Sequence, residues 1–113
     1  MNNAYQAGLL YELRAARYVR RRGYRVLSMR YRARDGEIDL IARDGDTIAF
    51  IEVKARPAGE LGAGVAAVTA DKRRRLRHTA DAYLSRKGLR DAPCRFDILE
   101  FSRAGIFYME NAF

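Results

Sequence analysis

Two β-rich segments on either side of a glycine turn constrain the fold of this 113-residue chain more than any other feature. Residues 37–42 and 47–55 are rich in isoleucine, alanine and valine, and they flank Asp44-Gly45, a dipeptide typical of tight hairpin turns. The second segment carries apolar side chains on both of its faces, which is typical of a central strand that is covered on both sides. The pattern therefore predicts an antiparallel hairpin near the centre of a sheet.

Helical and strand-like segments surround this hairpin. Residues 4–22 predict a helix, because Ala, Leu, Arg and Glu dominate them and Gly23 follows. Residues 69–87 predict a second helix with Thr69 as its N-cap. Further strands are predicted at residues 24–31, 95–101 and 106–109, and a glycine-bearing loop at residues 57–64. The order αβββαββ in a chain of this length predicts a single α/β domain over residues 1–113, with a mixed sheet flanked by helices.

Positive charge dominates the composition. The chain has 22 lysines and arginines against 14 aspartates and glutamates, which gives a net charge of +8. Nine arginines and no acidic residue lie between residues 13 and 34, and five more cations lie in residues 72–77. Two clusters of one sign in a small domain favour a phosphate-binding surface over an ordinary solvated face. We therefore expect a nucleic-acid partner, with DNA as the first choice and RNA as the alternative.

The residues that are scarce exclude several classes of protein. A single cysteine, Cys94, excludes a disulfide scaffold, and a single histidine, His78, excludes a multi-histidine metal centre. No apolar run approaches the roughly 18 residues of a membrane span, and the first residues lack the apolar region of a signal peptide. We therefore expect an intracellular protein with no membrane partner.

Side-chain alternation gathers three charged residues on one face of the predicted hairpin. Glu52 and Lys54 share a face of the second segment. A two-residue turn would place Asp39 opposite Phe50, and a four-residue loop would place it opposite Glu52. Both registers put Asp39 on the face of Glu52 and Lys54, whereas a loop of odd length would separate them.

Two carboxylates beside a lysine are the groups that phosphodiester hydrolysis needs. Carboxylate oxygens are ligands that Mg²⁺ and Mn²⁺ prefer, and the metal neutralises the phosphate and activates water. The lysine can position that water or stabilise the pentacovalent phosphate. The alternative is a cross-strand ion pair among Asp39, Glu52 and Lys54. The covered central strand favours the site, because charged residues at the end of such a strand usually face a cleft.

Glu12 is a further candidate. It lies in the apolar stripe of the first predicted helix, together with Leu9, Leu13, Ala16 and Val19. An unpaired buried charge is costly, so this carboxylate needs a partner. Two readings remain open: a local salt bridge to an arginine, or a ligand that faces inward and joins the metal shell.

Residues 36–42 (Gly-Glu-Ile-Asp-Leu-Ile-Ala) and 50–56 (Phe-Ile-Glu-Val-Lys-Ala-Arg) resemble the signature of the YraN-like family. This bacterial group is similar to Holliday-junction resolvases and to the PD-(D/E)xK, or restriction-endonuclease-like, superfamily. The resemblance covers nearly the whole chain, with further matches at Gly8-x-x-x-Glu12, Lys72 and Arg95-Phe96-Asp97. It implies a restriction-endonuclease-like fold with an αβββαβ core and a metal-dependent nuclease that acts on DNA, including branched DNA. It also implies a bacterial cytoplasmic location, with the nucleoid as one option there, and a homodimer.

The resemblance assigns roles to matching residues. It implies that Asp39, Glu52 and Glu12 bind Mg²⁺ or Mn²⁺ and that Lys54 is the catalytic lysine beside Asp39 and Glu52. Glu37 would be an outer ligand or a structural residue. The predicted phosphate contacts are Arg17, Arg21, Arg56, Lys72, Arg73 and Arg74.

Three residues depart from the expected patterns. Ile38, and not proline, precedes Asp39, as is expected in this family; Arg30 stands where the family usually has asparagine, and Ala55 where threonine or serine is usual. None of these departures removes an implied ligand. The alternative function is a nucleic-acid-binding protein of the same fold that does not cut and acts with a partner, because superfamily membership alone does not establish cleavage.

Overall fold

The computed structural model describes residues 3–56 and 68–113, with side chains described from Gly8 onward in the first stretch. In chain order the elements are α1 (Asn3–Arg21), β1 (Arg25–Ala33), β2 (Gly36–Asp44), β3 (Thr47–Arg56), α3 (Ala70–Arg86), β4 (Cys94–Ser102) and β5 (Gly105–Met109). This is the predicted αβββαββ order, and every boundary lies within two residues of its prediction. The loop predicted at residues 57–64 lies outside the described residues.

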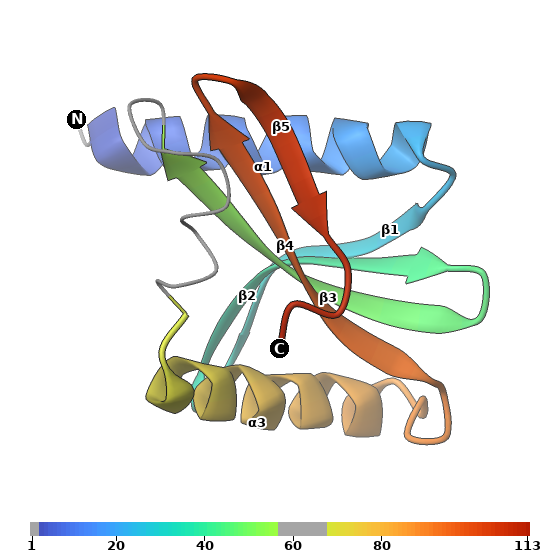
Figure 1. Ribbon diagram of the computed structural model, residues 1–113. Helices are drawn as coiled ribbons and strands as arrows, with labels where there is room; N and C mark the ends of the chain where they lie inside the picture. Colours follow the sequence, from blue (N-terminus) through green and yellow to red (C-terminus); the bar gives the residue numbers. More distant parts are fainter. Residues whose placement is uncertain (1–2, 57–67) are drawn as a thin grey trace.

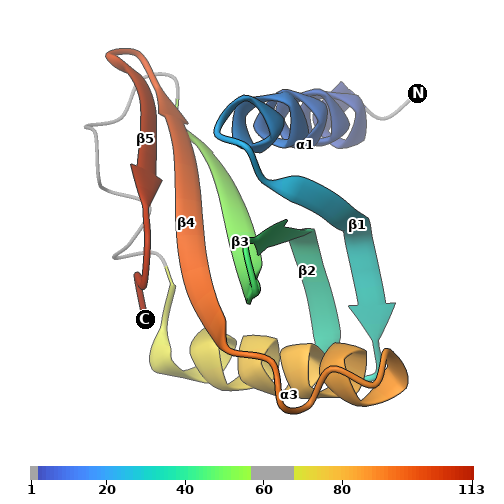
Figure 2. The ribbon, with the colours of Figure 1, turned by 90° about the vertical axis from the view of Figure 1, so that its right-hand side faces the viewer.

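The five strands form one sheet in the order β1-β2-β3-β4-β5. Strands β3 and β4 are parallel, and every other neighbouring pair is antiparallel. Because α3 lies between β3 and β4 in the chain, it belongs to the long crossover that parallel neighbours require. Helices α1 and α3 lie on opposite faces of the sheet (Figure 1), and the turned view shows the sheet between them (Figure 2). The predicted α/β class is confirmed, and the arrangement is consistent with a restriction-endonuclease-like core.

The α1 side of the sheet is packed through small residues. Ala15, Ala16 and Val19 are at most 1% exposed and share a buried cluster with Leu40 and other sheet residues. Alanines on the inner face allow the helix backbone to approach the sheet closely. The predicted apolar stripe is wrong at Leu13, which is 51% exposed, because the helix turns its alanines rather than this leucine toward the sheet.

The α3 side is packed through the residues that its sequence predicts. Leu76, Ala80, Tyr83 and Leu84 are buried in a second cluster together with Phe50 of β3. Burying a large apolar side chain stabilises the fold by about 1.5–3 kcal/mol, so these contacts hold α3 against the sheet.

The first turn of α3 is fixed by a cap. Thr69 stands in extended conformation before the helix, and its hydroxyl oxygen accepts a hydrogen bond of 3.2 Å from the backbone N–H of Lys72. Such a cap satisfies one of the free donors at a helix start and contributes about 1 kcal/mol. The predicted N-cap is confirmed, and the cap fixes the backbone from which the Lys72 side chain projects.

The β2–β3 turn differs by one residue from its prediction. Asp44 pairs with Thr47, so the two central positions are Gly45 and Asp46 rather than Asp44 and Gly45. Gly45 adopts a φ of +59°, a left-handed conformation that glycine tolerates best. The resulting register brings Asp39 level with Glu52, the arrangement that the sequence associates with a four-residue loop.

Candidate active site

The candidate site lies where β2 and β3 separate. Their ladder ends at the pair Leu40–Ile51, while β2 stays paired with β1 as far as Gly36 and β3 stays paired with β4 as far as Arg56. The divergence of the two strands is visible in Figure 2. Asp39 and Glu52 are the first residues beyond the last ladder pair, so the fork in the sheet places both carboxylates at its base.

The Asp39 side chain takes over a backbone hydrogen bond at the fork. Its Oδ2 accepts a bond of 2.9 Å from the backbone N–H of Val53, a donor that no longer has a partner on β2. A charged acceptor for a backbone N–H gives a strong hydrogen bond. This bond orients the Asp39 side chain toward β3, which is the strand that carries Glu52 and Lys54.

Asp39 and Glu52 oppose each other electrostatically. Glu52 is only 4% exposed, and its buried Oε1 atom has no hydrogen-bond partner among residues 3–56 and 68–113. Burial first, and the charge of Glu52 second, raise the pKa of Asp39 to about 7. Two carboxylates in one poorly solvated place cost free energy unless a cation lies between them.

Two lysines supply positive charge to this pair. The Lys72 Nζ atom lies 3.2 Å from Glu52 Oε2. Burial lowers the pKa of Lys54, and the hydrogen bond and charge of Lys72 lower it further. Burial also acts to lower the pKa of Lys72, but its contacts with Lys54 and Glu52 outweigh that effect and raise it. The site therefore holds one firmly charged ammonium beside a second lysine that loses its proton more easily.

Glu12 forms a salt bridge, as one of its two readings anticipates. Its Oε1 accepts a hydrogen bond from Nε of Arg30 on β1, and its side chain is 13% exposed. The charge of Glu12 still contributes to the raised pKa of Asp39, so it bears on the site. Whether Glu12 also binds a metal stays a prediction.

Arg30 has an unusual backbone. Its φ of +53° lies in the left-handed region, where asparagine is tolerated better than arginine. The left-handed backbone would suit the asparagine that the resemblance leads us to expect at this position. Here the arginine side chain reaches under α1, where its NH2 atom would lie 3.7 Å from a Cβ added at Gly8.

The donor set at the fork fits a hard divalent cation. Within residues 3–56 and 68–113, no group of three or more His, Cys, Asp or Glu side chains is gathered closely enough to hold a metal ion. Mg²⁺, however, is commonly held by one or two carboxylates and keeps several waters. Asp39 and Glu52 supply two carboxylates, and Glu52 Oε1, which accepts no hydrogen bond from the described part of the chain, is a buried acceptor that a cation would satisfy.

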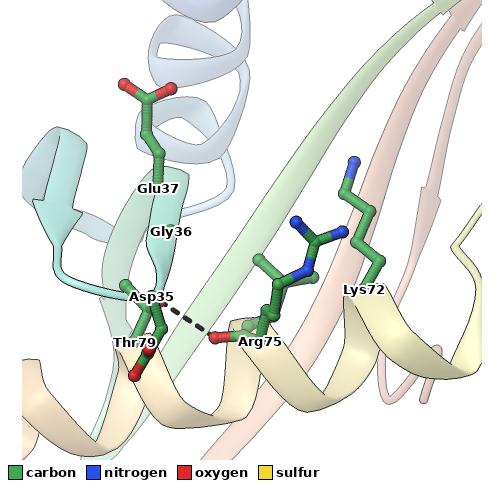
Figure 3. Close-up of a pocket in the computed structure, with 7 residues that line it drawn as sticks. Asp35, Gly36, Glu37, Lys72, Arg75 and Thr79 are labelled. Carbon is green, nitrogen blue, oxygen red and sulfur yellow. Dashed lines mark hydrogen bonds between the residues drawn. The ribbon is translucent and has the colours of Figure 1, made fainter.

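A small cavity of about 90 Å³ adjoins the site through Lys72. Figure 3 shows Lys72 and Arg75 projecting from α3, and Thr79 donating its hydroxyl to the Arg75 carbonyl at 2.9 Å. Glu37 also lines the cavity and pairs with Arg32, which keeps its role as an outer ligand a prediction. The full lining consists of Asp35, Gly36, Glu37, Lys72, Arg75, Leu76 and Thr79.

The predicted phosphate contacts fall into separate places. Lys72 lies in the site itself, and Arg73 and Arg74 follow it on α3. Arg73 donates to the Val68 carbonyl at 3.1 Å, and Arg74 pairs with Asp71. All three cations therefore lie on the helix that covers the face of the candidate site.

The other predicted phosphate contacts are Arg17, Arg21 and Arg56, and they lie in two other places. Arg17 and Arg21 line a groove with Phe101 and Ile106, on the helix that covers the other face of the sheet. Arg56 ends β3, and none of the described residues forms a hydrogen bond with its buried Nε atom. The structure thus brings Lys72, but not Arg17 and Arg21, to the carboxylate pair.

Glu100 is a carboxylate that the sequence reasoning missed. It is fully buried on β4, level with Lys54 in the parallel β3–β4 register. Residues level with each other on neighbouring strands point to the same face, so Glu100 belongs to the side of the sheet that carries the site. Glu100 follows Phe96 and Ile98 at every second position of β4, and this spacing predicts that its side chain shares their face of the sheet.

The described part of the chain contains no helix that is both long and apolar enough to cross a membrane.

Comparisons with known proteins agree on one family. Residues 11–101 match the sequence model described as "Uncharacterised protein family UPF0102". A UPF0102 protein YraN of Salmonella arizonae is 41% identical over 110 residues, which cover 96% of this chain and 84% of that protein. A UPF0102 protein of Symbiobacterium thermophilum is 47% identical over 89 residues, or 79% and 75% of the two chains. A third, of Pelotomaculum thermopropionicum, is 41% identical over 112 residues, or 94% and 93%. The YraN-like resemblance of the central motifs is confirmed.

Proposed function

The chain belongs to the UPF0102 family, and we propose that it is a metal-dependent nuclease that hydrolyses phosphodiester bonds in DNA. The observation that carries the proposal is the carboxylate pair at the fork of the sheet, half-buried Asp39 and buried Glu52, together with Lys54 and Lys72. Groups with strongly perturbed pKa values concentrate at functional sites, because folding alone has no use for mutually repelling buried acids.

The site residues divide the work of hydrolysis. Asp39 and Glu52 would hold Mg²⁺ or Mn²⁺ through their carboxylate oxygens. When bound there, such an ion would supply charge neutralisation at the phosphate and a more acidic water. Lys54, whose lowered pKa favours the neutral amine, accepts a proton from the attacking water or holds that water in line with the phosphorus atom. Lys72 binds a non-bridging phosphate oxygen.

The basic side chains support a nucleic acid as the substrate. Arg73 and Arg74 stand beside Lys72 on α3, where they can contact successive phosphates of a strand that enters the site. Branched DNA is the substrate class that the similarity to Holliday-junction resolvases suggests. A homodimer would match the two-fold symmetry of such a junction, and the bacterial cytoplasm or nucleoid is where that substrate occurs.

A second function has a specific observation in its favour. Lys72 already neutralises Glu52, and Arg30 already neutralises Glu12, so much of the acidic charge is balanced from within the chain. A protein of this kind can bind DNA through its arginines without any metal. The alternative is therefore a nucleic-acid-binding protein that does not cut by itself and acts with a partner.

A cleavage panel separates the two functions. Labelled duplex, single-stranded, flap and four-way-junction DNA, with matching RNA strands, are incubated with purified protein in Mg²⁺, Mn²⁺ or EDTA. The nuclease predicts metal-dependent cutting that Asp39→Ala abolishes and that the exposed-site control Asp91→Asn retains. Salt-sensitive binding without cutting, equal in wild type and Asp39→Ala, would instead establish the binding protein.

A further inference from the structure

The ammonium group of Lys72 occupies a position that a metal ion would share. We propose that Lys72 is a resident cation that a divalent metal displaces from Glu52, and that the released ammonium then binds a DNA phosphate. One side chain would thereby couple metal binding to DNA binding. The inference rests on the proposed function, because it needs Asp39 and Glu52 to be the metal ligands.

Distance places the two cations in competition. Lys72 Nζ is 3.2 Å from Glu52 Oε2, and the Glu52 side chain is only 6% exposed. Mg²⁺ binds carboxylate oxygens at about 2.0–2.1 Å, so a metal on either Glu52 oxygen would stand within a few ångströms of the ammonium. Two positive charges at that separation in a poorly solvated place repel each other strongly. A metal that binds Glu52 therefore favours departure of Lys72.

The Lys72 side chain is free to depart without disturbing the fold. Its backbone N–H is fixed by the Thr69 cap, while the side chain is 34% exposed at the end of a flexible four-carbon stem. Lys72 also lines a cavity together with Arg75, and Figure 3 shows both side chains projecting from α3. A rotation of the stem can carry the ammonium away from Glu52 while the helix stays in place.

The other cations near the carboxylates are less suited to this exchange. Arg30 forms a salt bridge with Glu12, and the Arg30 side chain is 22% exposed. The left-handed backbone of Arg30 fixes its position further. Lys54 lies on β3, two residues beyond Glu52, and not on the helix that carries Arg73 and Arg74. Lys72 alone of these three bridges the carboxylate pair and the helix that carries Arg73 and Arg74. Binding of metal and of DNA should therefore strengthen each other, as linkage requires.

Mn²⁺ binding to the DNA-free protein tests the displacement step. Free Mn²⁺ is measured by electron paramagnetic resonance in titrations of wild type, Lys72→Met and Lys87→Met, the last of which removes an exposed lysine from the end of α3. We expect Lys72→Met to bind Mn²⁺ about tenfold more tightly, or about 1.4 kcal/mol, and Lys87→Met to match wild type. Equal or weaker binding by Lys72→Met would overturn the proposal.

A second variant isolates the charge. Lys72→Arg keeps a cation near Glu52, so its Mn²⁺ affinity should stay close to that of wild type. If Lys72→Arg binds Mn²⁺ as tightly as Lys72→Met, the effect does not come from the cation and the proposal is wrong. DNA binding, followed by anisotropy with the DNA checked for intactness, gives the second half of the coupling. Mg²⁺ should raise the DNA affinity of wild type several-fold more than that of Lys72→Met, and an equal rise would refute the release of Lys72.

Asp39→Asn distinguishes this inference from the function beneath it. If Asp39→Asn binds Mn²⁺ as tightly as wild type, the carboxylate pair is not the metal site and the proposed function fails. If Asp39→Asn loses Mn²⁺ binding while Lys72→Met equals wild type, the metal site stands and only the displacement fails.

Discussion

Replacing Asp39 by asparagine should stabilise the metal-free protein at alkaline pH and leave it nearly unchanged at acidic pH. Burial raises the pKa of Asp39 most, the charge of Glu52 raises it next, and the pKa reaches about 7. Asparagine keeps an oxygen that can accept the Val53 N–H, but it carries no charge to desolvate. The comparison therefore isolates the cost of ionising this carboxyl inside the fold.

The sign follows from proton linkage. Between pH values of about 4 and 7 the folded state holds a proton on Asp39 that the unfolded state has released. Stability of the wild type relative to Asp39→Asn is therefore greatest below a pH of about 4 and falls as the pH rises to about 7. The rise of the Asp39 pKa from 3.8 to about 7 corresponds to a loss of roughly 4 kcal/mol in unfolding free energy at alkaline pH, at about 1.4 kcal/mol per pKa unit.

Urea denaturation in EDTA at a series of pH values measures this difference directly. We expect Asp39→Asn to exceed wild type by about 2–4 kcal/mol in unfolding free energy at a pH of about 8, and by little at a pH of about 4. Asp91→Asn controls for the loss of one exposed charge. A difference that does not change with pH, or a wild type that is the more stable protein at alkaline pH, would refute the reasoning.

Three further predictions follow from other contacts. Lys54→Met should abolish cleavage while leaving DNA affinity within about threefold of wild type, as measured by a gel-based cleavage assay and by anisotropy; unchanged cleavage would remove Lys54 from the mechanism. Asp97→Ala should lower the unfolding free energy by about 3–5 kcal/mol, because it leaves Arg95 without its buried partner. Asp97 is fully buried, and it accepts hydrogen bonds from Arg95 Nε at 2.9 Å and from the Asn111 N–H at 3.0 Å. Urea denaturation measures that loss, and a value below about 1 kcal/mol would contradict it. Replacing Arg73 and Arg74 together by alanine should reduce the slope of log affinity against log salt by up to about 2 in titrations of DNA, and an unchanged slope would place the DNA elsewhere.

Much of the fold is readable from local sequence patterns. The Thr69 cap, the apolar face of α3 and the apolar character of β3 on both faces each depend on neighbours within one element, and each is confirmed. The class of the fold follows from the order of these elements. Long-range packing is less accessible: α1 turns its alanines inward and leaves Leu13 exposed, because the close approach of helix and sheet suits small side chains.

The site was predictable only in part for a related reason. Alternation places Asp39, Glu52 and Lys54 on one face of a hairpin, but the fork in the sheet and the Asp39–Val53 hydrogen bond arise from how β2 and β3 diverge. No local sequence pattern predicts that divergence of the two strands. The contact between Lys72 and Glu52 joins residues on a helix and a strand 20 positions apart, so the sequence could suggest a phosphate contact for Lys72 but not its position beside the carboxylates.

The turn between β2 and β3 shows how small a difference decides such a register. Asp44-Gly45 and Gly45-Asp46 both satisfy the need for glycine in a two-residue turn, and only the latter brings Asp39 level with Glu52. Pairing with β1 and β4 on either side of the hairpin adds constraints that the dipeptide does not contain.

Anomalous scattering from a crystal soaked in Mn²⁺ tests the central claim most directly, because it locates the metal without reference to activity. The proposed site predicts a peak within coordination distance, about 2.0–2.2 Å, of a carboxylate oxygen of both Asp39 and Glu52. A matched crystal of Asp39→Asn should lack that peak. Mn²⁺ bound elsewhere, or no peak at the fork at saturating Mn²⁺, would contradict the assignment of these two carboxylates as the metal ligands.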